Sequence, residues 1–395
     1  MKNTMPPANL ISILLMLLLA AQVVATDMYL PALPQIASDL SSSTGQVQWT
    51  LTAYILSFGF MQLVAGTIAD RYGRRRTLLW GLAFYVVAGV IGACSENLPL
   101  LLLSRIVQGA ATAGAVISAR AIIRDQYSAV AGLGIMARSM TGMSLIGVLC
   151  PVFGGLVTEY WGWHTTLAMI AVFGTLIWCI VFFYFTENHA VSEQDLSVTA
   201  IDFLQHKKFL FSSLLAGLSF SGAIAFLMLS PFVFIGEFGM SRIAYGVLPA
   251  LCSLAFLSGT IACRTALRRW PVPQVVKFGA GLSLLGGVGE FLLWHFGYRT
   301  VLTLAVPQCV YMLGHGFHQP CGQGGAVAPF PRCAGRAAAL SGFLITATAF
   351  VVGQLISHSA VKASQTLVLT MLSLAILLAT LSWFAIPRAY SEHAG

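Results

Sequence analysis

The feature that most constrains this chain is a series of apolar stretches of about 20 residues or more, with very few charges inside them. Stretches of that length can cross the hydrocarbon core of a bilayer. The 395 residues are 57% hydrophobic and 9% charged, whereas a soluble domain carries about 25% charged residues. A soluble fold could not cover its surface with this composition, and backbone within a bilayer must satisfy its own hydrogen bonds. The sequence therefore predicts an all-α membrane protein.

Twelve such spans can be counted along the chain. Their approximate bounds are 8–36, 47–68, 77–94, 98–121, 134–158, 164–185, 209–235, 243–264, 274–296, 300–322, 336–357 and 365–387. The longest polar stretch, residues 186–208, separates six spans from six, which is typical of transporters built from two pseudo-symmetric halves. We expect an N-terminal six-helix bundle over 1–185, a linker over 186–208 and a C-terminal six-helix bundle over 209–395.

The basic residues give this layout an orientation. Seventeen of the 21 Lys and Arg residues fall on one side of the spans; Arg242, Arg299 and Lys362 fall on the other, and Arg105 lies within a span. Short loops rich in Lys and Arg stay in the cytoplasm, so both termini and the linker are predicted to be cytoplasmic. The net charge of +8 is thus a topology signal and does not indicate a nucleic-acid partner.

One basic turn, residues 66–76, reads G-T-I-A-D-R-Y-G-R-R-R between the second and third spans. It resembles the G-x-x-x-D-R-x-G-R-R signature of the loop between helices 2 and 3 in the major facilitator superfamily. The resemblance implies that superfamily's twelve-helix fold in two halves. It also implies a conformational switch, in which charged side chains pair and unpair with neighbouring helix ends; the alternative is a topology anchor only. The residues that match are Gly66, Asp70, Arg71, Gly73, Arg74 and Arg75.

Asp27 lies within the first span, in A-T-D-M-Y-L-P-A-L-P. A carboxylate inside a span is costly and is by default a functional hypothesis. Removal from water favours the protonated form of a carboxyl group, so Asp27 is a candidate proton carrier. The alternative is a solvated position near the outer interface, because Pro31 and Pro34 follow closely.

Two segments narrow the resemblance. The run from Asp27 to Pro34 resembles the first-helix signature of the bicyclomycin and chloramphenicol resistance subfamily of drug:proton antiporters. Residues 328–340 resemble that subfamily's loop between helices 10 and 11, although Arg336 replaces the usual small hydroxyl residue. The resemblance implies export of small amphipathic drugs in exchange for protons, by a monomer in the bacterial inner membrane.

Two further motifs fit that function. The stretch L-S-R-I-V-Q-G, which contains Arg105 and Gln108, is similar to the superfamily's fourth-helix motif. We hypothesise that Arg105 holds Asp27 deprotonated in one state; the alternative is a structural charge that never takes part. The stretch C-P-V-F-G-G resembles the fifth-helix motif of antiporters. It contains Pro151, Gly154 and Gly155, and its glycines would allow helices to approach closely.

Other polar residues are expected around a substrate cavity. His315 and His318 fall on one face of the tenth span by their spacing, and a metal site would need further ligands that the sequence does not offer. With Tyr29, Tyr54 and Gln108, these histidines are predicted to line the cavity. Glu290 lies near the end of the ninth span and is expected at the membrane interface rather than at a second proton site. Eight cysteines without a C-x-x-C pair indicate inert thiols.

The sequence therefore predicts a proton-coupled efflux transporter that needs no cofactor. No G-x-x-x-x-G-K-[ST] loop is present, so a gradient rather than ATP would supply the energy. An uptake permease for a nutrient is the main alternative, because it would share the fold and the basic turn. A membrane enzyme would require clustered nucleophiles, bases or metal ligands, and the motif set argues against a scaffold or channel.

Overall fold

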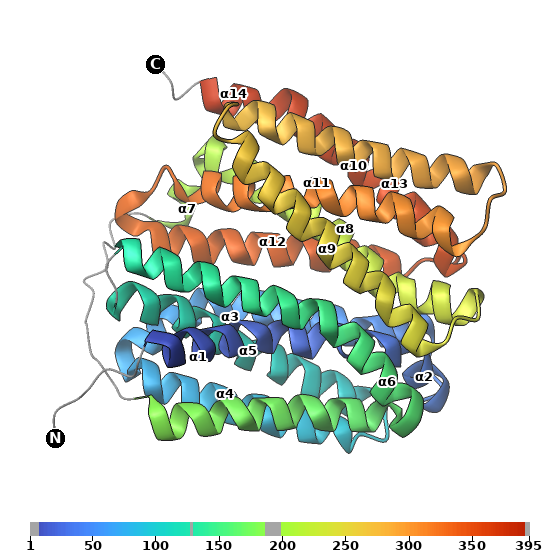
Figure 1. The fold of residues 1–395 in the computed structure, drawn as a ribbon, viewed down its shortest axis with the longest axis horizontal. Helices are drawn as coiled ribbons and strands as arrows, with labels where there is room; N and C mark the ends of the chain where they lie inside the picture. The colour runs from blue at the N-terminus through green and yellow to red at the C-terminus, as the bar shows by residue number, and fades with distance from the viewer. Residues whose placement is uncertain (1–7, 127–128, 186–198, 392–395) are drawn as a thin grey trace.

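The computed structural model describes residues 8–126, 129–185 and 199–391, and within these ranges it is helical almost throughout, with no strand (Figure 1). The elements of the first half are α1 (Ala8–Asp27), η1 (Leu30–Ala32), α2 (Leu33–Asp39), α3 (Thr44–Tyr72), α4 (Arg74–Ala93), α5 (Leu98–Gln126) and α6 (Ala129–Tyr184). Those that follow are α7 (Ala200–Gln205), α8 (Lys207–Pro231), η2 (Phe232–Glu237), α9 (Arg242–Ala266), α10 (Val272–His295), α11 (Val301–Val327), η3 (Pro331–Cys333), α12 (Ala334–Ser357), α13 (Ala363–Thr380), η4 (Leu381–Ala385) and α14 (Ile386–Ser391).

The twelve predicted spans are all present as helices. Ten helical segments of the described chain are long and apolar enough to cross a membrane. One of them contains two spans, because the chain reverses at Gly162 inside α6, where φ is 81° (Figure 1). The twelfth is α11, which is 27 residues long and carries no charged side chain; its histidines and glutamines lower its hydropathy. The twelve-helix major facilitator fold predicted from the sequence is confirmed.

The first span is broken in its middle. α1 ends at Asp27, and a short turn leads into the 3-10 helix η1 and then α2. Pro31 and Pro34 lie at the first turns of η1 and α2. Proline has no backbone N–H, so it is tolerated in the first turn of a helix but would interrupt one continuous helix through this region. The break leaves the Asp27 side chain at the carboxyl end of a helix rather than in the middle of one.

The helices of the N-terminal half lie together, as do those of the C-terminal half (blue to green and yellow to red in Figure 1). Between the halves, α3 packs against α12 and α6 packs against α9. Two helix pairs therefore form most of the contact between the halves.

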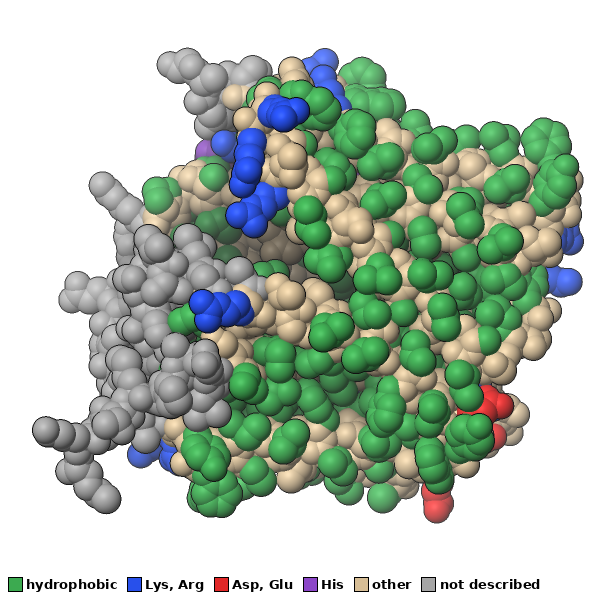
Figure 2. Space-filling view, in the orientation of Figure 1, with side chains coloured by type: hydrophobic (Ala, Val, Ile, Leu, Met, Phe, Trp, Pro, Cys, Tyr) green, Lys and Arg blue, Asp and Glu red, His purple; other side chains and the backbone are tan. Residues whose placement is uncertain are grey.

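The two ends of the bundle differ in charge. The start of α1 and the end of α14 lie at the end of the bundle that carries the turn between α3 and α4 and the turn between α9 and α10 (Figure 1). We name this the basic end, because basic side chains such as Arg71, Arg75 and Arg269 lie there. The opposite end holds Asp39, Glu96, Glu159 and the turns around them. On the face shown in Figure 2, Lys and Arg gather mainly at the basic end and acidic side chains at the opposite end.

Candidate functional site

Asp27 lies between the two halves and is partly exposed. Thr26 donates a hydrogen bond from its Oγ1 to the Asp27 Oδ1, with 2.7 Å between the two oxygens. Asp27 is within electrostatic reach of Tyr54 on α3, Cys150 on α6 and Tyr245 on α9. Because α9 belongs to the other half, this carboxyl group sits where the two halves face each other.

Arg105 is fully buried on α5 and has a separate set of partners. Its Nη1 donates to Gln108 Oε1 at 2.5 Å and its Nη2 donates to the Ala25 carbonyl oxygen at 2.8 Å. The guanidinium lies 4.5 Å from the ring centre of Tyr29 and 4.7 Å from that of Tyr54. Cation–π contacts of this kind stabilise a buried guanidinium.

The two tyrosines are themselves fixed by hydroxyl groups. Tyr29 shares a hydrogen bond of 3.0 Å with Thr50, and the Tyr54 hydroxyl donates to Thr112 at 3.1 Å. These threonines are not among the residues predicted from the sequence. A hydroxyl side chain within a membrane span is the one feature that could have marked them. Tyr29 and Tyr54 have no exposed surface and Gln108 is almost fully buried, and in this conformation all three surround Arg105.

Arg105 and Asp27 are not joined in this conformation. Within the described ranges, no ion pair or hydrogen bond links them, although Arg105 reaches the backbone of Ala25, only two residues before Asp27. The guanidinium is thus held against the same helix end that carries the carboxyl group. Pairing of the two side chains would require a change at the break in the first span.

The basic turn holds helices of the N-terminal half together. Gly73 separates α3 from α4 with φ 91° and ψ 148°, a backbone conformation that is essentially restricted to glycine. Arg75 donates to the carbonyl oxygens of Phe185 at 2.6 Å and Phe182 at 2.7 Å, at the carboxyl end of α6. Arg74 is largely buried and Arg71 lies over the ring of Tyr72. The side chain of Asp70 lies outside the described part of the structure.

The fifth-helix motif lies where backbones meet. A Cβ at Gly154 would overlap the carbonyl oxygen of Met28, in the break of the first span, and one at Gly155 would overlap the carbonyl oxygen of Arg242 on α9. From the other side, a Cβ at Gly246 would come within 2.6 Å of the carbonyl oxygen of Pro151. The motif therefore packs α6 directly against α1 and against the other half.

The halves are closed at the opposite end. There the Arg242 Nη1 lies 3.2 Å from the Glu159 Oε2. The Gln48 amide donates to the Met228 carbonyl oxygen at 3.3 Å, and the Gln354 amide donates to Thr52 at 3.2 Å. These contacts all join one half to the other.

Toward the basic end the contact between α3 and α12 stops. A Cβ at Gly342 of α12 would still come within 2.5 Å of the Gln62 side chain of α3, whereas a Cβ at Gly66, one turn nearer the end of α3, would meet no atom within 4 Å. The surface is hollowed between the halves toward this end (Figure 2). The conformation is therefore open toward the basic end and closed at the other.

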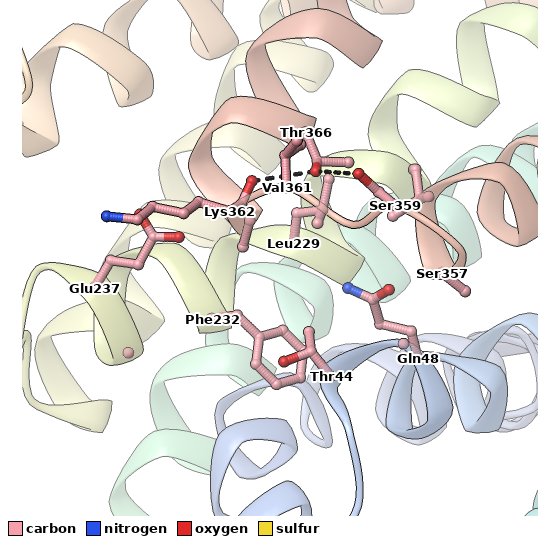
Figure 3. A pocket seen from close by; sticks show the side chains of 14 residues that line it. Thr44, Gln48, Leu229, Phe232, Glu237, Ser357, Ser359, Val361, Lys362 and Thr366 are labelled. Atoms are coloured by element: carbon pink, nitrogen blue, oxygen red, sulfur yellow. Dashed lines mark hydrogen bonds between the residues drawn. The ribbon is translucent and has the colours of Figure 1, made fainter.

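A pocket of about 350 Å³ lies between the halves at the opposite end (Figure 3). Thr44 and Gln48 of α3 form one wall. Phe232 and Glu237 of η2 and Lys362, which precedes α13, form the others. The Glu237 carboxylate accepts a hydrogen bond from the backbone N–H of Ser364, at the start of α13.

The two histidines lie in the core of the C-terminal half. The Nδ1 atoms of His315 and His318 lie 2.7 Å and 3.3 Å from the Ser219 Oγ of α8. His315 also contacts the ring of Phe256 on α9, with 4.9 Å between ring centres. Both side chains are buried. The two histidines share one helix face and lie where α8, α9 and α11 pack together; their predicted place in the cavity wall stays a prediction.

Glu290 is enclosed by protein although it lies near the end of its helix. It is 1% exposed, inside the C-terminal half, and neither of its carboxyl oxygens has a hydrogen-bond partner among the described residues. Distance from the helix end can be read from the sequence, but the face of α10 that Glu290 occupies cannot.

Comparison with known proteins agrees with this architecture. Residues 15–353 match the family described as Major Facilitator Superfamily. Multidrug resistance protein D of Escherichia coli (strain K12) is 28% identical over 346 residues, which cover 84% of this chain and 84% of that protein. A bicyclomycin resistance protein homolog of Haemophilus influenzae is 27% identical over 274 residues, covering 66% and 68%.

The fold is also that of solved transporters. The crystal structure of a D-xylose-proton symporter superimposes with a TM-score of 0.78 over 96% of this chain and 98% of that one, at 14% identity. At 14% identity, this similarity is evidence for the fold and not for a shared substrate. With a family match over most of its length and this fold, the chain belongs to the Major Facilitator Superfamily and is a multi-pass membrane transporter of small molecules.

Proposed function

We propose that this transporter exports small amphipathic drugs in exchange for protons. The observation that carries the proposal is Asp27: a carboxyl group at the break of the first span, partly exposed between the halves and without a cationic partner among the described side chains. Such a group can bind a proton on one side and release it on the other if its surroundings alternate. The relatives whose names refer to multidrug and bicyclomycin resistance support a drug as the exported molecule.

The motion would be a rocking of residues 1–185 against residues 209–395, joined by the 186–208 linker. In the observed conformation the substrate would enter from the basic end, which we take to be cytoplasmic because Lys and Arg concentrate there. Opening the opposite end would break the Glu159–Arg242 pair and the Gln48 and Gln354 hydrogen bonds. The pocket between α3 and α13 would then widen into the exit to the outside of a bacterial inner membrane.

Arg105 would set the protonation state of Asp27. Its guanidinium is held at Ala25 and between two tyrosine rings, so a shift of the α1 break could bring Asp27 to it. An approaching guanidinium favours the ionised carboxylate, and the proton would leave. We propose that the basic turn, including Asp70 and Arg75, governs how readily the halves change state and has no part in substrate choice.

The test uses protein reconstituted in lipid vesicles with bicyclomycin or ethidium as probes. Asp27→Asn keeps the shape but carries no titratable proton. We expect it to bind a probe but to lose export driven by a pH gradient, and addition of the probe should release no protons from the purified variant. Asp27→Glu should retain part of the activity, because the titrating group survives at a shifted position.

Glu96→Gln is the matched control, since it removes an exposed carboxylate from the turn between α4 and α5. It should export as the unaltered protein does. Active, pH-driven export by Asp27→Asn would show that the proton travels by another residue. Proton-driven accumulation of a nutrient by the unaltered protein, without drug export, would favour the uptake permease instead.

A further inference from the structure

A second carboxyl group, Glu290, is enclosed within the C-terminal half. On its helix, Gly286 lies against Pro307 of α11 and Gly287 lies against Met371 of α13. Glu290 follows them by four and three residues, which places it on the same helix face. The carboxyl group is therefore covered by α11 and α13 and is 1% exposed.

Among the described residues, no positive charge pairs with Glu290. Cys252 of α9 is within electrostatic reach, Cys309 and Tyr311 are the titratable residues of α11 at this level, and α13 carries none. On α10 itself, Lys277 lies about 20 Å away toward the basic end, and His295 is exposed at the helix terminus. Beyond it, Arg299 lies over the ring of Trp294.

An ionised Glu290 would thus be an isolated buried charge. Such a charge costs far more than a neutral polar group, and a carboxylate with no donor among its neighbours has nothing to offset that cost. Both oxygens lack a partner within the described ranges. The carboxyl group can remain in this place if it carries a proton.

Further buried polar side chains lie between Glu290 and the middle of the bundle. Both amide atoms of Gln308 and the Ser283 Oγ are buried without a hydrogen-bond partner among the described residues, and His318 is within hydrogen-bond reach of the Val276 backbone of α10. A Cβ at Gly314 would touch the Ser283 Oγ, and one at Gly279 would come within 3.1 Å of the His318 Nε2. Ser283 and His318 therefore line the seam between α10 and α11, and Gln308 is a further buried amide of α11.

Buried polar atoms of this kind are normally satisfied by ordered water. A hydrated seam would connect Glu290 with His318, whose other nitrogen bonds Ser219. In the other direction Glu290 is five residues from the end of α10, which is about 7.5 Å along the helix axis. The outer face is thus the nearer source of protons.

We propose that Glu290 is a second proton-binding residue, loaded from the opposite end, so that two protons rather than one are exchanged for each neutral molecule exported. The inference rests on the proposed exchange of drug for protons. In the step, two protons enter, one on Asp27 and one on Glu290, and one neutral molecule leaves, so two positive charges move inward per cycle.

The first test reads the carboxyl group directly and needs no substrate. Infrared difference spectroscopy of the purified full chain at neutral pH should show a C=O stretching band of a buried protonated acid. Glu290→Gln should remove that band, while Asp27→Asn and the surface control Glu96→Gln should leave it. A spectrum of Glu290→Gln identical to that of the unaltered protein would mean that Glu290 is ionised, and the proposal would be overturned.

The second test measures stoichiometry in vesicles with bicyclomycin as the probe. With two protons per molecule, each tenfold proton gradient sustains about a hundredfold drug gradient, and Glu290→Gln should lower this to about tenfold. Glu290→Asp should restore the steeper dependence, which a merely structural defect would not explain. An unchanged slope in Glu290→Gln would refute the second site while leaving proton-driven export intact; absence of any gradient in the unaltered protein would count against the proposed function instead.

Discussion

At the residue scale, two ionisable side chains of the N-terminal half differ in how many contacts hold them. Arg105 is fully buried, yet two hydrogen bonds and two aromatic rings surround its guanidinium. Each ring contact contributes about 0.5–2 kcal/mol. Among the described residues, the Asp27 carboxyl group accepts one hydrogen bond, from Thr26, and the residue is partly exposed. The arginine is therefore held by more contacts than the carboxyl group is.

The residue with the plainest stability consequence is Gly73. Its φ of 91° and ψ of 148° cost a side chain about 1–3 kcal/mol, so Gly73→Ala should lower thermal stability. Gly281→Ala is the control, because a Cβ there meets no atom within 4 Å and alanine favours a helix over glycine by about 1 kcal/mol. The unfolding temperature in detergent should fall for Gly73→Ala and rise for Gly281→Ala. Equal shifts in the two variants would contradict the role of backbone strain at Gly73.

At the element scale, closure at the opposite end depends on backbone contact more than on charge. Glu159 and Arg242 are 34% and 28% exposed, and an exposed pair of that kind contributes about 0–1 kcal/mol. By contrast, α6 and α9 touch through Gly155 and Gly246, and α3 touches α12 through Gly45 and Gly353. The glycines allow the helices to meet without side chains between them.

Gly155→Val should therefore disfavour the observed conformation. The added side chain would overlap the Arg242 carbonyl oxygen, and overpacking costs about 1–3 kcal/mol. The opposite end should then open, and a cysteine placed at Ser359, in the pocket wall, should react faster with a membrane-impermeant thiol reagent. The rate of labelling should rise by about tenfold.

The comparison variant is Gly289→Val, at a position where a Cβ meets no atom within 4 Å. It adds the same side chain to a helix of the C-terminal half and should leave labelling at Ser359→Cys unchanged. Equal acceleration by both variants would mean that bulk alone, rather than the contact between α6 and α9, disturbs the closed end.

At the scale of the whole molecule, the charge difference between the two ends predicts the orientation. In a background without the native cysteines, Glu96→Cys should react with an impermeant reagent added to intact cells. Arg269→Cys should react only after the cells are made permeable. Both positions are exposed, so accessibility within the protein does not bias the comparison, and the reverse pattern would overturn a cytoplasmic basic end.

The sequence was a good guide to the number of spans, because length and hydropathy are local properties. It was a poor guide to which side chains are enclosed. Distance from a span end suggests an interfacial place for Glu290, and spacing puts the two histidines on one face, whereas the burial of all three depends on the neighbours that α10 and α11 acquire in the fold. The hypothesis that Arg105 meets Asp27 concerns one state of the cycle, and in the observed state Gln108 and Ala25 compete for its donors. Which acceptor the guanidinium binds depends on how the helices pack, and this cannot be read from the sequence of one span.

The composition of α11 has a consequence for how the chain enters the membrane. This helix carries Gln308, His315, His318 and Gln319, all buried in the finished bundle, and it is not among the segments apolar enough to qualify alone. If α11 entered the bilayer alone during biosynthesis, these polar side chains would face lipid, and the free energy of insertion would be unfavourable. Its integration therefore depends on α8 and α10 already being beside it. Assembly of the C-terminal half is in this sense cooperative at the translocon, before any transport begins.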